Sequence, residues 1–114
     1  DRALTTRRFG ELAEEVYELS NSEAMEALGK EFRTPGHIPL CRESPGGLSK
    51  RQGHTELAVA IARLSGNIPC TIGAEMLDPD GDGALSLQEA RKYAEEHGIP
   101  MITGNDIMES MDMV

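Results

Sequence analysis

Apolar residues recur at helical spacing at the start of the chain. The apolar positions are Phe9, Leu12, Val16 and Leu19. Steps of three or four residues place such side chains on one face of a helix. The pattern therefore predicts an amphipathic helix over residues 2–19, and Asp1 directly before it is a good helix N-cap.

Further helices are predicted where a capping residue precedes an apolar repeat. They are a short helix after the capping-box pair Ser20 and Glu23, residues 56–64, residues 87–97, and a last helix that opens at Asn105 or Asp106. Ser86 caps the helix over residues 87–97, and Gly98 closes it. Helical segments are thus spread along the whole chain.

Between these helices lie segments with the character of strands. Residues 38–40, 69–77 and 99–103 are short apolar runs bounded by proline, glycine or polar residues, and residues 78–83 form a turn. Crossover helices separate the predicted strands, so some strand pairs must be parallel. The sequence therefore predicts an α/β (α+β) fold, in which helices pack on a mixed sheet.

Charge and composition narrow the classes of function. The 114 residues carry a net charge of -9, which argues against nucleic-acid partners and against anionic membranes. Residues 1–57 hold 8 basic and 10 acidic side chains, against 3 and 10 in residues 58–114, so an anion site is expected in the first half. No apolar run reaches the roughly 20 residues that span a bilayer. Cys41 and Cys70 lack a CxxC spacing and are predicted to be reduced thiols of a cytoplasmic protein, although a disulfide between them stays open.

Residues 78–89, DPDGDGALSLQE, match the calcium loop of an EF-hand. An EF-hand also needs a helix that enters the loop. The residues upstream favour a strand, and no second loop is present to pair with the first. The aspartates and glycines also suit a tight turn, and Ser86 with Glu89 suits a capping box. The calcium-binding module is kept only as an alternative.

The segment Lys50-Arg51-Gln52-Gly53-His54-Thr55-Glu56 carries the most chemical information. A helix starts directly after Gly53, and helix N-termini offer unpaired N–H groups to a phosphate. Arg51 can add a charge-assisted bidentate contact, and Thr55 can donate its hydroxyl. The same residues also fit a basic loop before a capped helix, so the pattern by itself leaves both interpretations open.

Three other side chains are candidates for catalysis. His54 can bind a divalent metal or move a proton. His37 follows Pro35-Gly36 at a bend that can direct it into a cleft. Glu75 lies near the end of a predicted strand, where open α/β sheets bind ligands. A structural histidine and an exposed strand carboxylate are the plainer alternatives.

Taken together, these motifs resemble one enzyme family. FRTPGHIPL, PGGLSKRQGHTE and AEMLDPDG, together with the opening DRALT, resemble 3,4-dihydroxy-2-butanone 4-phosphate synthase in order and spacing. The resemblance runs from Asp1 to about Ile107. It implies that residues 1–114 form the C-terminal half of a single synthase-like domain, incomplete at its N-terminus.

The resemblance also implies a reaction and a site. The family converts D-ribulose 5-phosphate to formate and L-3,4-dihydroxy-2-butanone 4-phosphate in riboflavin biosynthesis, with Mg²⁺ or Mn²⁺. The implied substrate-binding residues are Arg51, Gln52, Gly53, His54 and Thr55. His54 is also the implied metal ligand, His37 and Glu75 are the implied catalytic pair, and Glu56 lies beside the metal site.

The family pattern further implies partners. It implies a homodimer and an acidic loop that completes the metal site from the N-terminal half of the same enzyme. Without that half, the 114 residues are expected to be inactive. The alternatives are the calcium-binding module and a non-catalytic phosphate-binding domain that kept the fold.

Overall fold

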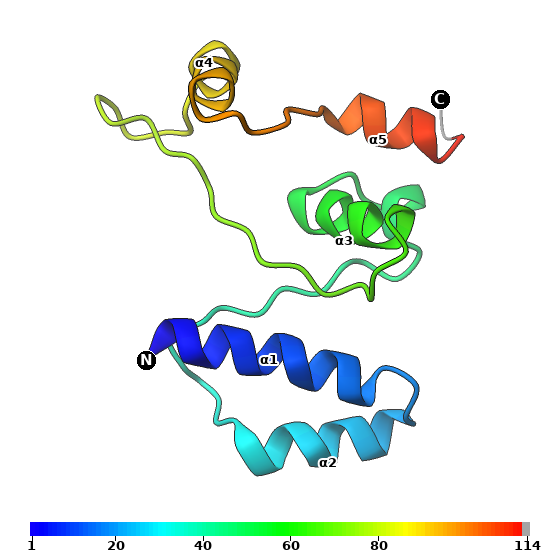
Figure 1. Cartoon of the computed structure of the whole chain (residues 1–114). Helices are drawn as coiled ribbons and strands as arrows, with labels where there is room; N and C mark the ends of the chain where they lie inside the picture. Colours follow the sequence, from blue (N-terminus) through cyan, green and yellow to red (C-terminus); the bar gives the residue numbers. More distant parts are fainter. Residues whose placement is uncertain (113–114) are drawn as a thin grey trace. The chain divides into compact units, whose positions relative to one another are not determined.

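The structure is a computed structural model that describes residues 1–112, and helices dominate it (Figure 1). The helices are α1 (Arg2–Val16), α2 (Asn21–Glu31), α3 (His54–Leu64), α4 (Leu87–His97) and α5 (Gly104–Ser110), with a short 3-10 helix, η1, at Gly47–Ser49. Two compact units are present: the first is Asp1–Ile72 and the second starts at Gly73. Within residues 1–112, every helix is too short or too polar to cross a membrane.

The predicted mixed sheet is wrong. Residues 38–40, 69–77 and 99–103 were expected to be strands, and none of them forms one. Within residues 1–112, the β-structure is a single antiparallel bridge between Leu77 and Ala84. The α/β (α+β) class therefore does not describe this chain as it stands.

The physical reason is that a strand needs a neighbour. A helix closes its hydrogen bonds within its own segment, whereas a strand forms only when another strand pairs with it. The predicted strands keep their apolar composition but are left in the open: Ile72 is 78% exposed, Leu77 66% and Ile102 54%. Strand propensity largely reports how well a side chain fits a pleated, half-buried surface, and that surface is missing here.

The predicted helices are confirmed, because their signals are local. Ser20 Oγ accepts a hydrogen bond from the Glu23 amide at the start of α2, and Ser86 Oγ does the same for the Glu89 amide at the start of α4. Gly98 closes α4 in the left-handed conformation, at φ 63°. The first helix ends earlier than predicted, at Val16 instead of residue 19, because a turn follows before Ser20 starts α2.

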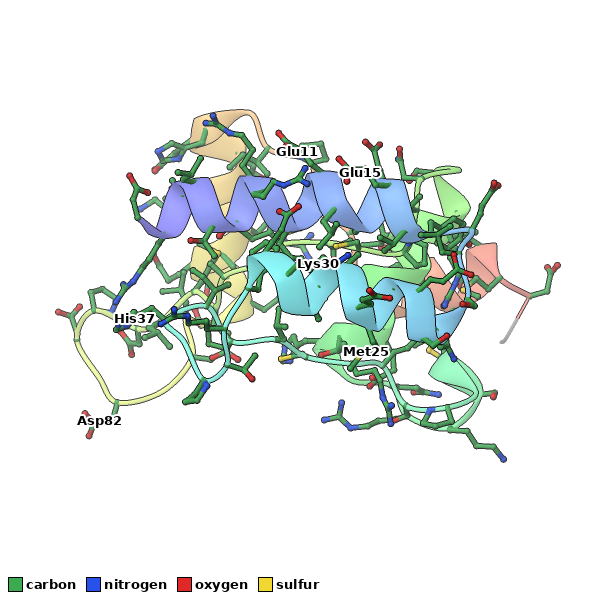
Figure 2. All side chains as sticks on the ribbon, turned by 90° about the horizontal axis from the view of Figure 1, so that it is seen from below. Glu11, Glu15, Met25, Lys30, His37 and Asp82 are labelled. Atoms are coloured by element: carbon green, nitrogen blue, oxygen red, sulfur yellow. The ribbon has the colours of Figure 1, made fainter. Side chains whose placement is uncertain are left out.

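Two contacts join α1 to α2 in the first unit. The Phe9 and Phe32 rings meet edge to face, with 5.9 Å between their centroids. Arg8 donates to the Glu31 carboxylate through Nε and Nη2, both at 2.6 Å, and to Glu15 through Nη1 at 2.9 Å. The bonds from Arg8 lower the pKa of Glu31. Figure 2 shows Glu11 and Glu15 on α1, with Met25 and Lys30 on α2.

A small core forms around α3 in the same unit. Val59, Ala60 and Ala62 of α3 are buried, as is Leu48 of η1, which contacts α3. The aliphatic core that the composition predicts is therefore present here. It places the segment before α3 against the helix, and that segment contains most of the predicted site.

The second unit contains the turn at residues 78–83, which is confirmed. The Asp78 amide donates to the Gly83 carbonyl at 2.9 Å, and Asp78 Oδ1 accepts from the Asp80 amide at 2.9 Å. Residues 70–76, ahead of this turn, are not helical, so the loop lacks the entering helix of an EF-hand. Asp82 projects from the outer end of the turn (Figure 2).

Candidate functional site

The turn before α3 is organised by one buried carboxylate. Glu56, in the first turn of α3, is 1% exposed. Its Oε1 accepts from Arg51 Nη1 at 2.7 Å and from the Gly53 amide at 3.2 Å. Its Oε2 accepts from the Ser44 amide at 3.2 Å. Both oxygens are therefore engaged, and they join three separate points of the loop to the helix.

These bonds keep Glu56 ionised. Burial raises the pKa of a carboxyl group, because the charged form loses its hydration. Here the hydrogen bonds from Arg51 and from the Ser44 and Gly53 amides outweigh burial and leave the pKa of Glu56 below its ordinary value. The group is a fixed negative charge matched by the Arg51 guanidinium.

Gly53 has no room for a side chain. A Cβ at this position would lie 2.3 Å from Arg51 Nη1 and 2.8 Å from Glu56 Oε1. Its backbone is extended, with φ -92°, so the glycine is needed for space and not for an unusual conformation. The Arg51 guanidinium takes the space that a side chain at this position would need.

The start of α3 leaves hydrogen-bond donors free. Gly53 is the N-cap and has no side chain to accept from the first turn. Within residues 1–112, the amides of His54, Thr55 and Glu56 have no hydrogen-bond acceptor. The Arg51 side chain is 62% exposed, and Nη1 is its only nitrogen bonded within the described residues. Unpaired helix amides beside a guanidinium suit a phosphate group.

A second ion pair fixes the other end of the same loop. Glu43 accepts from Arg63 near the end of α3, through Nη1 at 3.0 Å and through Nη2. These bonds lower the pKa of Glu43. The loop over residues 43–53 is thus tied to α3 at both ends, which fixes the segment that contains Arg51.

The remaining predicted residues are exposed. His37 is exposed on the loop after α2 (Figure 2), and within residues 1–112 it makes no hydrogen bond. Gln52 is exposed between Arg51 and Gly53. Glu75 is exposed on the extended segment that opens the second unit. The structure brings residues 51–55 together, while the roles of His37 and Glu75 stay predictions.

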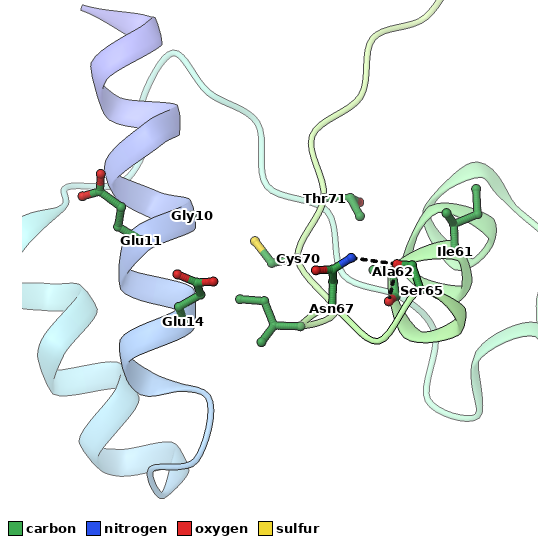
Figure 3. A pocket seen from close by; sticks show the side chains of 10 residues that line it. Gly10, Glu11, Glu14, Ile61, Ala62, Ser65, Asn67, Cys70 and Thr71 are labelled. Carbon is green, nitrogen blue, oxygen red and sulfur yellow. Dashed lines mark hydrogen bonds between the residues drawn. The ribbon is translucent and has the colours of Figure 1, made fainter. Parts of the chain in front are cut away.

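An open cavity of about 470 Å³ lies elsewhere in the first unit, between α1 and the segment after α3 (Figure 3). Glu11 and Glu14 of α1 line it on one side, and Asn67 and Cys70 on the other. Burial raises the pKa of the Cys70 thiol, which favours its uncharged form. None of the predicted site residues lines this cavity, so it is separate from the candidate site.

The described residues do not form a metal site on their own. His54 is exposed at the first position of α3 and offers one nitrogen. The Glu56 oxygens are already engaged, and within residues 1–112 no three histidine, cysteine or acidic side chains gather as ligands would. Magnesium prefers several oxygen ligands in octahedral geometry. This donor set therefore does not fit a complete magnesium site.

The sequence is similar to known proteins over nearly its full length. The family model for 3,4-dihydroxy-2-butanone 4-phosphate synthase matches residues 1–110. The chain belongs to this family. Relatives named 3,4-dihydroxy-2-butanone 4-phosphate synthase from Methanosarcina mazei and Archaeoglobus fulgidus are each 44% identical, over 96% of this chain. The riboflavin biosynthesis protein RibBA of Chlamydia muridarum is 37% identical over 72% of this chain and 19% of its own length.

The family match has two consequences. The chain spans 43% of the Methanosarcina mazei synthase and 44% of the Archaeoglobus fulgidus synthase, so it corresponds to less than half of these relatives. The matched range includes residues 78–89, so the EF-hand-like loop is part of a synthase sequence. Nothing in the comparisons favours the calcium-binding module.

Sequence reasoning placed Glu56 beside a metal site and missed its role as the centre of the loop. The signal was present, since Glu56 follows the N-cap by three residues, the spacing of a capping box. The bond to Ser44 and the pair of Glu43 with Arg63 had no comparable signal. Those contacts span 12 and 20 residues and depend on how the loop folds back on α3.

Proposed function

We propose that this chain provides the phosphate-binding part of an enzyme of riboflavin biosynthesis, a lyase that converts D-ribulose 5-phosphate to L-3,4-dihydroxy-2-butanone 4-phosphate and formate. The family match over residues 1–110 supports the reaction. The open start of α3 beside Arg51 supports the place of the phosphate. Arg51, Gln52, Gly53, His54 and Thr55 form the substrate segment of this proposal.

The remaining roles are part of the same proposal. His37 and Glu75 move protons during the enolisation, the loss of water and the skeletal shift, which need positioned acids and bases. His54 donates a nitrogen to a divalent cation, magnesium or manganese. The donors within residues 1–112 do not complete that site, so the oxygen ligands come from outside this chain. The complete enzyme is a cytoplasmic homodimer.

The decisive experiment compares the chain alone with a complete synthase that carries it. Formate release from D-ribulose 5-phosphate is expected only from the complete synthase, since the chain spans less than half of its relatives. His54→Ala is expected to abolish that release. Formate release by the purified 114-residue chain would refute the requirement for the rest of the enzyme. A complete synthase that binds but does not convert the substrate would favour a non-catalytic phosphate-binding domain.

The phosphate site has its own test. In the complete synthase, Arg51→Ala is expected to weaken binding of D-ribulose 5-phosphate by about 1.5–3 kcal/mol, the size of a hydrogen bond to a charged group. Arg42→Ala is the matched control, because Arg42 is also exposed and makes no ion pair within residues 1–112. Isothermal titration calorimetry of both variants measures the difference. Equal dissociation constants for the two variants would remove Arg51 from the site.

A further inference from the structure

Glu56 is the one charged residue that is buried within residues 1–112. A carboxylate loses its hydration when it is buried, and the protein must replace that hydration with hydrogen bonds. All of its partners lie in the loop before α3: the Ser44 amide, the Gly53 amide and Arg51. Two of these partners are backbone amides, and the third is a charged side chain.

The third partner differs from the other two. The Arg51 side chain is 62% exposed, whereas the Glu56 carboxylate that it meets is fully buried. The contact fixes where the guanidinium lies. Glu56 Oε1 joins Arg51 Nη1 to the Gly53 amide, so the guanidinium lies against the N-cap of α3. Within residues 1–112, Nε and Nη2 of Arg51 keep their hydrogens unpaired.

We infer that Glu56 is a positioning residue, whose buried carboxylate holds the Arg51 guanidinium beside the open amides of α3 so that both meet one phosphate group. The inference rests on the proposed function, and it names the residue that makes the phosphate site ready before the substrate arrives. Binding otherwise includes the cost of ordering a long side chain, about 0.5–1.5 kcal/mol for each side chain that is fixed. Glu56 orders the Arg51 side chain during folding, so substrate binding does not include this cost.

Titration of the full 114-residue chain with D-ribulose 5-phosphate tests the inference, with the amide signals of Gly53 and Thr55 followed by NMR. Glu56→Gln keeps the size but loses the charge that holds Arg51, and its single oxygen can replace only one of the two accepting carboxylate oxygens. We expect affinity about 3- to 10-fold weaker than wild type. Glu43→Gln is the matched control, because it loosens the other end of the loop without touching Arg51, and it should change affinity less than twofold. D-ribulose, which lacks the phosphate, should bind wild type and Glu56→Gln equally weakly.

Two further variants separate positioning from general loss of structure. Gly53→Ala keeps Arg51 and Glu56, but its Cβ would lie 2.3 Å from Nη1 and must displace the guanidinium. It should weaken phosphate binding as Glu56→Gln does, and it remains informative if Glu56→Gln does not fold. In an Arg51→Ala background, Glu56→Gln should have less than about a twofold further effect, because contacting residues are not additive.

Each outcome decides a different question. Wild-type chain that does not bind D-ribulose 5-phosphate would overturn the phosphate site itself, and the inference with it. Wild-type binding that Glu56→Gln and Gly53→Ala leave unchanged would overturn the inference alone. A full effect of Glu56→Gln in the Arg51→Ala background would also overturn it, since Glu56 would then act through another group.

Discussion

The starts of α3 and α4 share the spacing between N-cap and glutamate but differ in how their hydrogen bonds are arranged. Each has a glutamate three residues after its N-cap: Glu56 after Gly53, and Glu89 after Ser86. In α4 the serine side chain accepts from the Glu89 amide, and the Glu89 side chain is exposed. In α3 the cap has no side chain, and Glu56 is buried with three partners in the loop.

The two helix starts differ in whether a capping side chain accepts from the first-turn amides. Asp1, Ser20, Ser86 and Thr103 each use a side chain to cap their helices. At α3, Gly53 has no side chain to accept from the first-turn amides, so within residues 1–112 these stay free, and Glu56 accepts from the Gly53 amide. A capped end is complete, while the α3 end keeps donors available to another molecule.

The largest expected effect comes from removing the two glutamates in turn. Glu56→Ala leaves Arg51 and two amides without their acceptor, so the melting temperature should fall by about 5–10 °C. Glu89→Ala removes an exposed side chain and should stay within about 0.5 kcal/mol of wild type. Thermal denaturation followed by circular dichroism measures both. Equal losses would show that the two helix starts are equivalent.

Acid should weaken the α3 start next most strongly. The pKa of Glu56 is lowered in the folded state, because its hydrogen bonds outweigh burial. Such a group stabilises the fold fully above its unfolded pKa, near 4.3, and this stability is lost as pH falls through the lower folded value. The melting temperature of wild type should therefore drop below about pH 5, and that of Glu56→Gln should drop less. Parallel curves from pH 7 to pH 3 would contradict the prediction.

At α4 the expected effect is smaller and lies in the cap itself. Ser86→Ala removes the acceptor of the Glu89 amide and should destabilise the chain by about 1 kcal/mol, whereas Ser86→Gly should cost a few tenths. Urea unfolding measures both. A loss at Ser86→Gly as large as that at Ser86→Ala would show that the serine acts through something other than capping.

The smallest effect is expected inside the site loop. The Gln52 side chain is exposed and makes no hydrogen bond within residues 1–112, although it lies between Arg51 and Gly53. Gln52 belongs to the proposed substrate segment through its backbone, so Gln52→Ala should leave both stability and phosphate affinity within about 0.5 kcal/mol of wild type. Calorimetric titration with D-ribulose 5-phosphate checks it. A larger loss would show that the Gln52 side chain itself contacts the ligand.

The helices were predictable because their signals lie within one turn of chain. Ser86 and Gly98 mark both ends of α4, and Thr103 with Asp106 forms the capping box of α5 one residue earlier than expected. The strands were not predictable in this chain, because pairing is a property of two segments. Residues 69–77 have the composition of a strand, but among the described residues their only pairing is the bridge from Leu77 to Ala84.

The candidate site was predictable in part, unlike the helices, which were predictable, and the strands, which were not. Its location at residues 51–55 followed from a glycine, an arginine and a helix start that are adjacent in sequence. The contacts that hold the site together did not follow from the sequence, because Glu56 reaches back to Ser44 and the Glu43–Arg63 pair spans 20 residues. Local patterns therefore identified the donors, while the contacts that fix those donors appeared only in three dimensions.

The exposed segment over residues 71–77 has a practical consequence for handling the protein. It connects the two units without a helix, and Ile72, Met76 and Leu77 are all exposed along it. Proteases cut most readily where an accessible backbone can extend through their active sites. Brief digestion with chymotrypsin, which cleaves after large apolar residues, should therefore cut first at Met76 or Leu77. The two fragments would correspond closely to the two units.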